Sequence, residues 1–144
     1  MSLAGAYDEA NIFAKILRGE MPAARVFEDE LALAFMDVFP QTRGHTLVIP
    51  KGVHARNFLD FPTASIGPYM ERVQRVARAV EKALQPDGLA IMQLNGGPAG
   101  QTVFHLHFHV LPRWEGEAMK GHGKAPMADM AALNALAAEI RAAL

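Results

Sequence analysis

Three histidines alternate with apolar residues in one short segment of the chain, His105-Leu106-His107-Phe108-His109. Side chains on a β-strand point to opposite faces in turn, so imidazoles at every second position share one face and lie roughly 6.5–7 Å apart. The intervening apolar side chains would then face the core. A strand over residues 102–111 would therefore aim a row of three rings at one phosphate group or one metal ion. The apolar positions of that strand are Phe104, Leu106, Phe108 and Val110.

Three interpretations of this row of histidines are open. The first is nucleophilic catalysis, because imidazole with a pKa of ~6.5 is largely neutral near pH 7 and can attack phosphorus to form a phosphoramidate-type intermediate. The second is a metal site, for which Asp37, His45 or His54 would supply a further ligand. The third is a solvated row on an exposed sheet face. The strict alternation favours nucleophilic catalysis, in which the flanking rings orient the nucleophile and stabilise charge on the phosphoryl oxygens.

A glycine-rich loop precedes the histidines. Gly96, Gly97 and Gly100 allow the backbone to approach a ligand closely. Gln101 and Thr102 then place hydrogen-bonding side chains at the entrance of the predicted strand. Because this loop lies next to the aligned histidines, it adds support for the catalytic interpretation.

The composition limits the classes of protein to which the chain can belong. Its 144 residues are enough for one domain with a hydrophobic core, and the formal net charge of −1 provides no basic field for nucleic acid. Since there is no cysteine, disulfides, thiolate metal sites and a cysteine nucleophile are excluded. No apolar run approaches the roughly 18 residues that span a membrane, and no signal-peptide pattern is present. We therefore predict a cytoplasmic protein with no membrane or nucleic-acid partner.

The periodicity of the apolar residues predicts strands mixed with a few helices. The clearest helix spans Thr63–Leu84, where apolar residues recur at helical spacing and the basic residues fall largely on the other faces, which indicates a solvated surface. Further helices are predicted over residues 8–18 and 127–144, and strands over residues 25–27, 31–38, 45–49, 88–95 and 102–111. This order predicts an α+β fold, an antiparallel β-sheet of about five strands with two to three helices.

The segment His105–Leu111 reads His-φ-His-φ-His-φ-φ, where φ is apolar, and so resembles without departure the signature of the histidine triad (HIT) family of nucleotide hydrolases and transferases. The segments 12–16, 19–23, 35–37, 44–51 and 100–103 are also similar to family motifs, and the first two resemble the Hint branch. The resemblance implies one HIT domain over residues 1–144. Its motif-bearing core would span residues 8–113, followed by a C-terminal tail at 114–144 that carries no family motif.

The resemblance assigns catalytic roles to residues at the matching positions. The middle histidine, His107, would be the nucleophile that takes the nucleotidyl group, and His109 would contact the α-phosphate and the leaving group. His105 and His45 would form a network that fixes the tautomer and the orientation of His107. Thr102 would donate a hydrogen bond near the leaving group.

The resemblance also implies a nucleotide-binding pocket. Asp37 would bind the ribose hydroxyls, and Asn95 would line the region of the ribose and the phosphate. Gly100 and Gln101 would contribute from the glycine-rich loop. The base pocket would consist of Ile12, Phe13, Ile16, Phe35 and Val38.

The chain departs from some relatives in ways that bear on function. Some bacterial relatives hold a structural zinc partly with cysteines, and that site should be absent here because the chain has no cysteine. Met36 stands where several relatives have histidine, so contacts to the base or the ribose would differ. The segment 111–113 also resembles the Fhit branch, which acts on dinucleoside polyphosphates. His54 and His122 match no motif and are predicted to be surface residues.

The resemblance thus implies a hydrolase that acts at the α-phosphate of a purine nucleotide with a phosphoramidate or acyl leaving group, without a metal or another cofactor. A covalent nucleotidyl group on His107 would be hydrolysed by water to an AMP-type product. Relatives in the Hint and Fhit branches are homodimers with a sheet that continues across the interface, so we expect a homodimer. The open alternatives are a dinucleoside polyphosphate hydrolase and a nucleotide-binding regulatory module with slow turnover.

Overall fold

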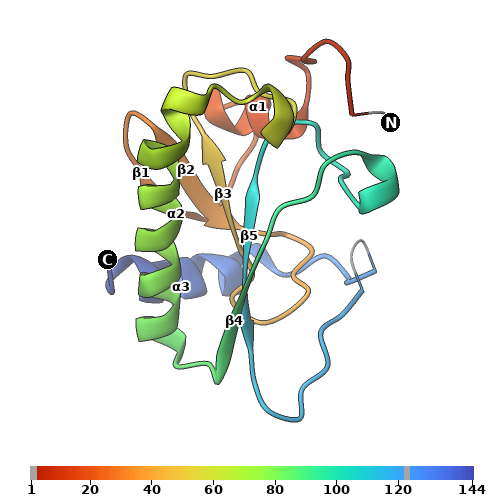
Figure 1. Ribbon diagram of the computed structural model, residues 1–144. Coiled ribbons are helices and arrows are strands. Elements are labelled where there is room, and N and C mark those ends of the chain that lie inside the picture. Colours follow the sequence, from red (N-terminus) through yellow and green to blue (C-terminus); the bar gives the residue numbers. More distant parts are fainter. Residues whose placement is uncertain (1–2, 122–123) are drawn as a thin grey trace.

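The computed structural model describes residues 3–121 and 124–144, and an antiparallel sheet lies at its centre (Figure 1). The elements are the strands β1 (Arg25–Glu28), β2 (Ala32–Met36), β3 (Thr46–Pro50), β4 (Gly88–Met92) and β5 (Phe108–Arg113), the helices α1 (Ile12–Leu17), α2 (Thr63–Leu84) and α3 (Met130–Arg141), and the short 3₁₀ helices η1 (Phe58–Asp60) and η2 (Gly97–Ala99). The strands lie in the order β1-β2-β3-β5-β4, and all neighbours are antiparallel. The predicted α+β fold with a five-stranded antiparallel sheet is therefore confirmed.

Each face of the sheet carries its own apolar cluster. Helices α2 and α3 pack on one face, against Ala34, Val48 and Val110 of the central strands. Helix α1 packs on the other face, and Figure 1 shows it behind the sheet from α2. Because both faces of β2 and β3 are covered, every residue of these strands is buried, and all are apolar except Thr46. The residues that pack around α1 are Phe13, Ile16, Leu33, Phe35, Leu47 and Ile49.

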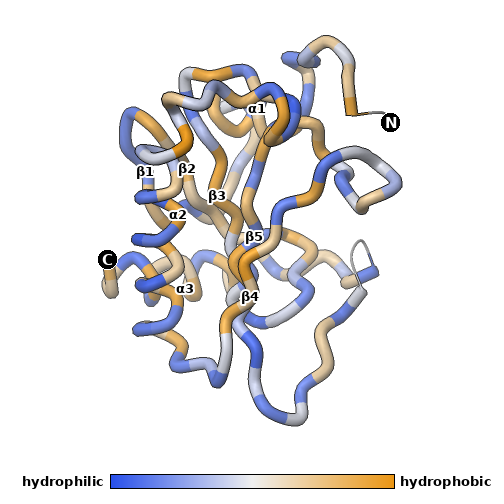
Figure 2. Tube along the Cα trace, in the orientation of Figure 1, coloured by the Kyte–Doolittle hydropathy of each residue, from blue (hydrophilic) through white to orange (hydrophobic). Residues whose placement is uncertain are grey.

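Helix α2 has the bounds that its apolar spacing predicts. Its buried residues face the sheet, and Figure 2 shows the hydrophilic stretches that alternate with apolar ones along its length. Arg72 donates from Nε to Asp29 Oδ2 over 2.9 Å, which ties the helix to the turn between β1 and β2. Its other basic residues are exposed or partly exposed, as a solvated face requires. No helix among the described residues has the length and apolar character needed to cross a membrane.

The helices at the two ends of the chain start later than predicted, because a side chain caps each of them. Asn11 Oδ1 accepts a hydrogen bond from Ala14 N over 2.9 Å, so α1 begins at Ile12 rather than at residue 8. Asp129 accepts from Ala132 N over 3.1 Å, so α3 begins at Met130 rather than at residue 127.

The strand predicted over residues 102–111 begins only at Phe108. Leu106 N donates to Ala55 O over 2.9 Å, and the side chain of Gln101 donates to Arg56 O over 2.8 Å. These bonds hold the preceding segment against residues 55–56 instead of in the sheet ladder. The prediction that all three histidines lie on one strand is therefore wrong, since only His109 belongs to β5.

Candidate active site

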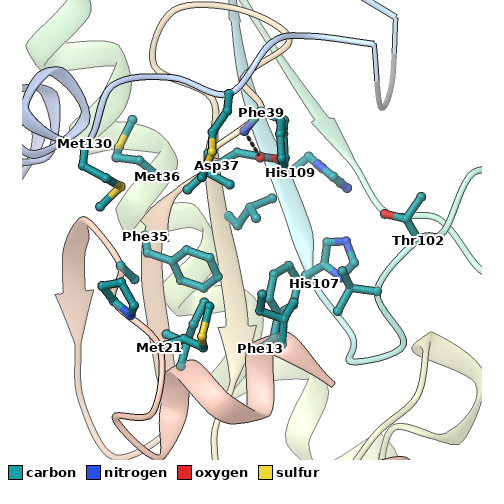
Figure 3. Close-up of a pocket in the computed structure, with 18 of the residues that line it drawn as sticks. Phe13, Met21, Phe35, Met36, Asp37, Phe39, Thr102, His107, His109 and Met130 are labelled. Carbon is teal, nitrogen blue, oxygen red and sulfur yellow. Dashed lines mark hydrogen bonds between the residues drawn. The ribbon is translucent and has the colours of Figure 1, made fainter. Parts of the chain in front are cut away.

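A cavity of about 460 Å³ opens between α1, β2, the segment before β5 and the first turn of α3 (Figure 3). His107, His109 and Thr102 line one end of it, and Met21 and Met130 line the other. The wall between the two ends is largely apolar and includes Phe13, Phe35, Val38 and Leu47. A planar apolar group can therefore lie in the cavity while a polar group attached to it meets the histidines.

The rings of His107 and His109 lie side by side at the polar end. Their centroids are 4.9 Å apart and their planes are inclined by 61°. Both residues are buried, and the ring of Phe13 packs edge-on against His107 at 4.9 Å. The two rings are near enough to contact one phosphate group together.

The hydrogen bond of His107 determines which ring nitrogen can react. Its Nδ1 lies 2.7 Å from the main-chain oxygen of His105. Because a carbonyl oxygen can only accept, Nδ1 carries the proton of the neutral ring. The lone pair is then on Nε2, the nitrogen that can act as a nucleophile.

A chain of two hydrogen bonds gives His109 the opposite role. Gln41 N donates to His45 Nδ1 over 3.1 Å, so the proton of the neutral His45 ring is on Nε2. That nitrogen lies 2.9 Å from His109 Nδ1, which therefore accepts. The proton of His109 is then on its own Nε2. His107 offers a lone pair and His109 offers an N–H group at the same end of the cavity.

His45 supports a different histidine from the one predicted. The family resemblance places it in the network that orients His107, whereas its side chain contacts His109. The register explains this, because Leu47 pairs with His109 across β3 and β5. His45, two residues earlier, is a diagonal neighbour of His109 at the end of the strand.

His105 does not line the cavity, contrary to the prediction of three rings on one face. Its ring is buried behind the site, with Nε2 3.1 Å from Pro50 O and Nδ1 2.6 Å from the hydroxyl of Tyr7. The main-chain carbonyl of His105, rather than its ring, touches His107. Burial is the main cause that lowers the pKa of His105 to about 4, so this ring is neutral near pH 7.

Comparison with known proteins identifies the family. The family model of the HIT domain matches residues 18–116. The chain belongs to the HIT family. A HIT-like protein involved in cell-cycle regulation from Bartonella henselae, solved with an unknown ligand, matches with a TM-score of 0.90 and 48% identity, over 97% of this chain and 100% of that one.

Two further HIT relatives match over most of the chain. Protein hit of Bacillus subtilis (strain 168) is 46% identical over 103 residues, which are 72% of this chain and 70% of that protein. Adenylylsulfatase HINT3 of Arabidopsis thaliana is 33% identical over 117 residues, which are 77% of this chain and 59% of that protein. The family is one of nucleotide-binding proteins of the hydrolase type, and this HIT protein has His107 and His109 in a cavity that suits such a ligand.

Most residues predicted to bind the nucleotide do line the cavity of this HIT protein. Asp37 lies near its polar end, where Oδ1 accepts from Phe39 N over 2.8 Å and Oδ2 is 3.4 Å from His45 Nε2. Thr102 lies beside His107 (Figure 3). The predicted base-pocket residues that line the cavity are Ile12, Phe13, Ile16, Phe35 and Val38.

Three predicted contacts are not part of the lining, because they hold the glycine-rich loop in shape. Gln101 is buried and bonds to the main chain of Gly96 over 2.8 Å and of Val103 over 3.0 Å. Asn95 Oδ1 accepts from Phe58 N over 2.9 Å. Gly100 has φ +105°, a conformation that favours glycine, where it ends η2. The predicted direct contact of these three with the nucleotide is therefore not supported by their positions.

Three methionines that line the cavity were not predicted from the sequence. Met127 and Met130 come from the C-terminal tail, where no family motif was found, and Met21 comes from the segment after α1. A hydrogen bond of 2.8 Å from Ala128 N to Val38 O holds the tail beside the cavity. Alanine-rich sequence around these methionines gives no signal of a ligand site. His54 is exposed, as predicted, whereas His122 lies outside the described residues.

The cluster of Asp37, His45 and His109 is the place where a metal ion could be considered. One ligand atom from each lies within 4.8 Å of the others. However, His45 Nδ1 accepts from a main-chain N–H, so its Nε2 is protonated and lacks the lone pair that a metal needs. The hydrogen bonding therefore favours a proton-ordered network over a metal site.

Proposed function

We propose that this HIT protein hydrolyses a purine nucleotide at its α-phosphate through a covalent nucleotidyl group on His107. The observation that carries the proposal is the pair of tautomers, an Nε2 lone pair on His107 beside an Nε2–H group on His109. The two ring centres are 4.9 Å apart. At this distance His107 can attack phosphorus while His109 donates a hydrogen bond to a phosphoryl oxygen.

The reaction would take two steps. In the first, His107 Nε2 attacks the α-phosphorus, a P–N bond forms, and the bond to the leaving group breaks. A departing amine takes a proton from solvent, with the hydroxyl of Thr102 near its path, and a carboxylate departs without one. In the second, water attacks phosphorus, the P–N bond breaks, and a proton returns to solvent. His109 keeps its proton and donates a hydrogen bond to the phosphoryl group in both steps.

The cavity supports a purine nucleoside as the bound part of the substrate. Phe13 and Phe35 present aromatic surface to the base, and Asp37 presents a carboxylate to the ribose hydroxyls. Adenosine with a phosphoramidate or acyl leaving group fits this scheme. The relative in Arabidopsis thaliana is an adenylylsulfatase, so adenylyl sulfate is a further candidate substrate. Two functions are the alternatives to this proposal: hydrolysis of a dinucleoside polyphosphate, and nucleotide binding with slow turnover in a regulatory module.

We also propose a homodimer joined along β4. This strand is at the edge of the sheet, and Ile91 on it is 43% exposed. Pairing with β4 of a second copy would cover this edge and continue the sheet. Sedimentation of the purified protein measures its mass, and a monomer at micromolar concentration would contradict the proposal.

The proposed intermediate can be tested directly. Wild-type protein is mixed with adenosine 5′-phosphoramidate, quenched within milliseconds and analysed by intact and peptide mass spectrometry. We expect one adenylyl group on His107 and release of AMP. His107→Ala should form no adduct and lose at least about 1,000-fold in turnover. An adduct elsewhere, or wild-type turnover in His107→Ala, would remove the nucleophile from the scheme, and a parallel assay with diadenosine polyphosphates compares the alternative substrate class.

A further inference from the structure

The N-terminal segment before α1 lies against the back of the active site. Its anchor is a hydrogen bond of 2.8 Å from Asn57 Nδ2 to Leu3 O. In Figure 1 this segment begins near the loop that contains η2 and leads into α1. Tyr7 is half-buried in it, with its ring stacked on His54 at 4.7 Å and its hydroxyl 2.6 Å from His105 Nδ1. No motif in the sequence gave Tyr7 or this segment a role.

The direction of the bond between Tyr7 and His105 follows from the opposite side of the ring. His105 Nε2 lies 3.1 Å from Pro50 O, and because a carbonyl can only accept, Nε2 carries the proton. Nδ1 therefore accepts, and the hydroxyl of Tyr7 donates. Burial raises the pKa of Tyr7, so the phenol is protonated and able to donate.

These two bonds fix the residue on which the nucleophile depends. His105 is held at Nδ1 by Tyr7 and at Nε2 by Pro50, and its own main-chain oxygen accepts the proton of His107 Nδ1 over 2.7 Å. The segment from residue 102 to residue 107 is irregular and lacks a strand ladder. The peptide that carries this carbonyl is held by Leu106 N, which donates to Ala55 O over 2.9 Å, and by the two bonds of the His105 ring. We propose that Tyr7 is a positioning residue for His107, acting through the ring and the main-chain carbonyl of His105.

Tyr7→Phe separates this role from simple packing, because it keeps the ring and removes only the hydroxyl. This inference rests on the proposed function for its kinetic test. We expect the rate of adenylyl transfer to His107 from adenosine 5′-phosphoramidate to fall about three- to tenfold, with KM unchanged, because a hydrogen bond of ordinary net strength is lost. Tyr69→Phe is the matched control, since it removes another buried hydroxyl, bonded to Val48 O over 2.6 Å, away from the cavity. It should leave the rate of adenylyl transfer unchanged.

Ring ¹⁵N and ¹H signals of the histidines provide a second measurement that does not need turnover. In Tyr7→Phe, the Nδ1 signal of His105 should lose its hydrogen-bond shift, the Nδ1–H signal of His107 should move, and the pKa of His105 should rise from about 4 because its lone pair is released. The groups that face this ring are Tyr7, Pro50 O, Phe13, His54 and His107.

The two measurements distinguish this inference from the proposed function. If wild-type protein forms no adduct, the proposed function fails and the histidine signals alone decide the role of Tyr7. Histidine signals in Tyr7→Phe that match those of wild type would overturn the inference, whatever the rate. A normal rate of adenylyl transfer in Tyr7→Phe would also overturn it.

Discussion

The two ends of the cavity are built in different ways. At the histidine end, His107 is fixed by a main-chain carbonyl, and His109 is fixed by His45, which a main-chain N–H holds in turn. Each reacting ring therefore has one assigned tautomer. The opposite end is lined by the long, unbranched side chains of Met21 and Met130, and Met127 also lines the cavity. All three are exposed or partly exposed.

This difference matches what each end has to do. Attack at phosphorus requires the reacting atoms to be held close to one geometry, and a small displacement costs much of the rate. Binding of a base requires apolar contact, which flexible methionines provide without a fixed geometry. We therefore expect changes at the histidine end to alter kcat and changes at the methionine end to alter KM.

The largest effect expected from a residue that does not touch the substrate is at His45. His45→Leu removes the donor to His109 Nδ1, so the proton of His109 can move to Nδ1 and leave Nε2 without the hydrogen that we propose contacts the phosphoryl group. Loss of one such donor should lower kcat about 100-fold. Steady-state kinetics with adenosine 5′-phosphoramidate measure this effect.

A matched variant tests whether the donor is the cause. His45→Gln can place an amide N–H near the position of the imidazole Nε2–H, so it should recover most of the activity. If His45→Gln is as slow as His45→Leu, His45 does not act by determining which nitrogen of His109 carries the proton. The histidine end would then not depend on fixed tautomers, and the contrast between the two ends would be wrong.

Acid should lower the free energy of unfolding through His105, whose ring is buried behind the histidine end of the cavity. The pKa of His105 is about 4 in the folded protein because the ring is buried, against an ordinary value of 6.5. The unfolded chain therefore binds a proton here as the pH falls below 6.5, while the folded chain does not. The neutral ring of His105 therefore contributes its full share to the free energy of unfolding above pH 6.5. This share falls by about 3 kcal/mol as the pH decreases to 4.

Urea denaturation between pH 7 and pH 4 measures this loss. His105→Gln keeps an amide that can bond to Pro50 O and removes the titrating group, so its free energy of unfolding should depend less on pH over this range. An equal pH dependence in the variant and the wild type would show that other groups account for the acid sensitivity.

The sequence predicted the parts of the site that local patterns determine. Regular apolar spacing predicted the bounds of α2, and the family motif predicted that His107 and His109 belong to the site, where both line the cavity. The position of the His105 ring could not be predicted in the same way. It depends on hydrogen bonds of the irregular segment 101–107 to residues 50–56 and to Tyr7, all of which are distant in the sequence.

The methionine end escaped prediction for a related reason. Met127 and Met130 reach the cavity because the tail bonds to Val38 and α3 packs on β1, and neither contact leaves a pattern in the tail itself. A methionine in a sequence also does not by itself indicate a ligand contact, because its side chain has no strong hydrogen-bonding group that would suggest one.

The smallest expected effect is at Met127, an exposed methionine of the cavity lining. Met127 is 66% exposed, so Met127→Ala should cost little stability while it removes the apolar contact that we propose it makes with the base. We expect KM for adenosine 5′-phosphoramidate to rise about two- to fivefold with kcat unchanged, because part of one apolar side chain no longer becomes buried on binding. Met127→Leu keeps most of the apolar volume and should restore KM. A fall in kcat in Met127→Ala would mean that the methionine end also positions the reacting atoms, and the division between the two ends would then be wrong.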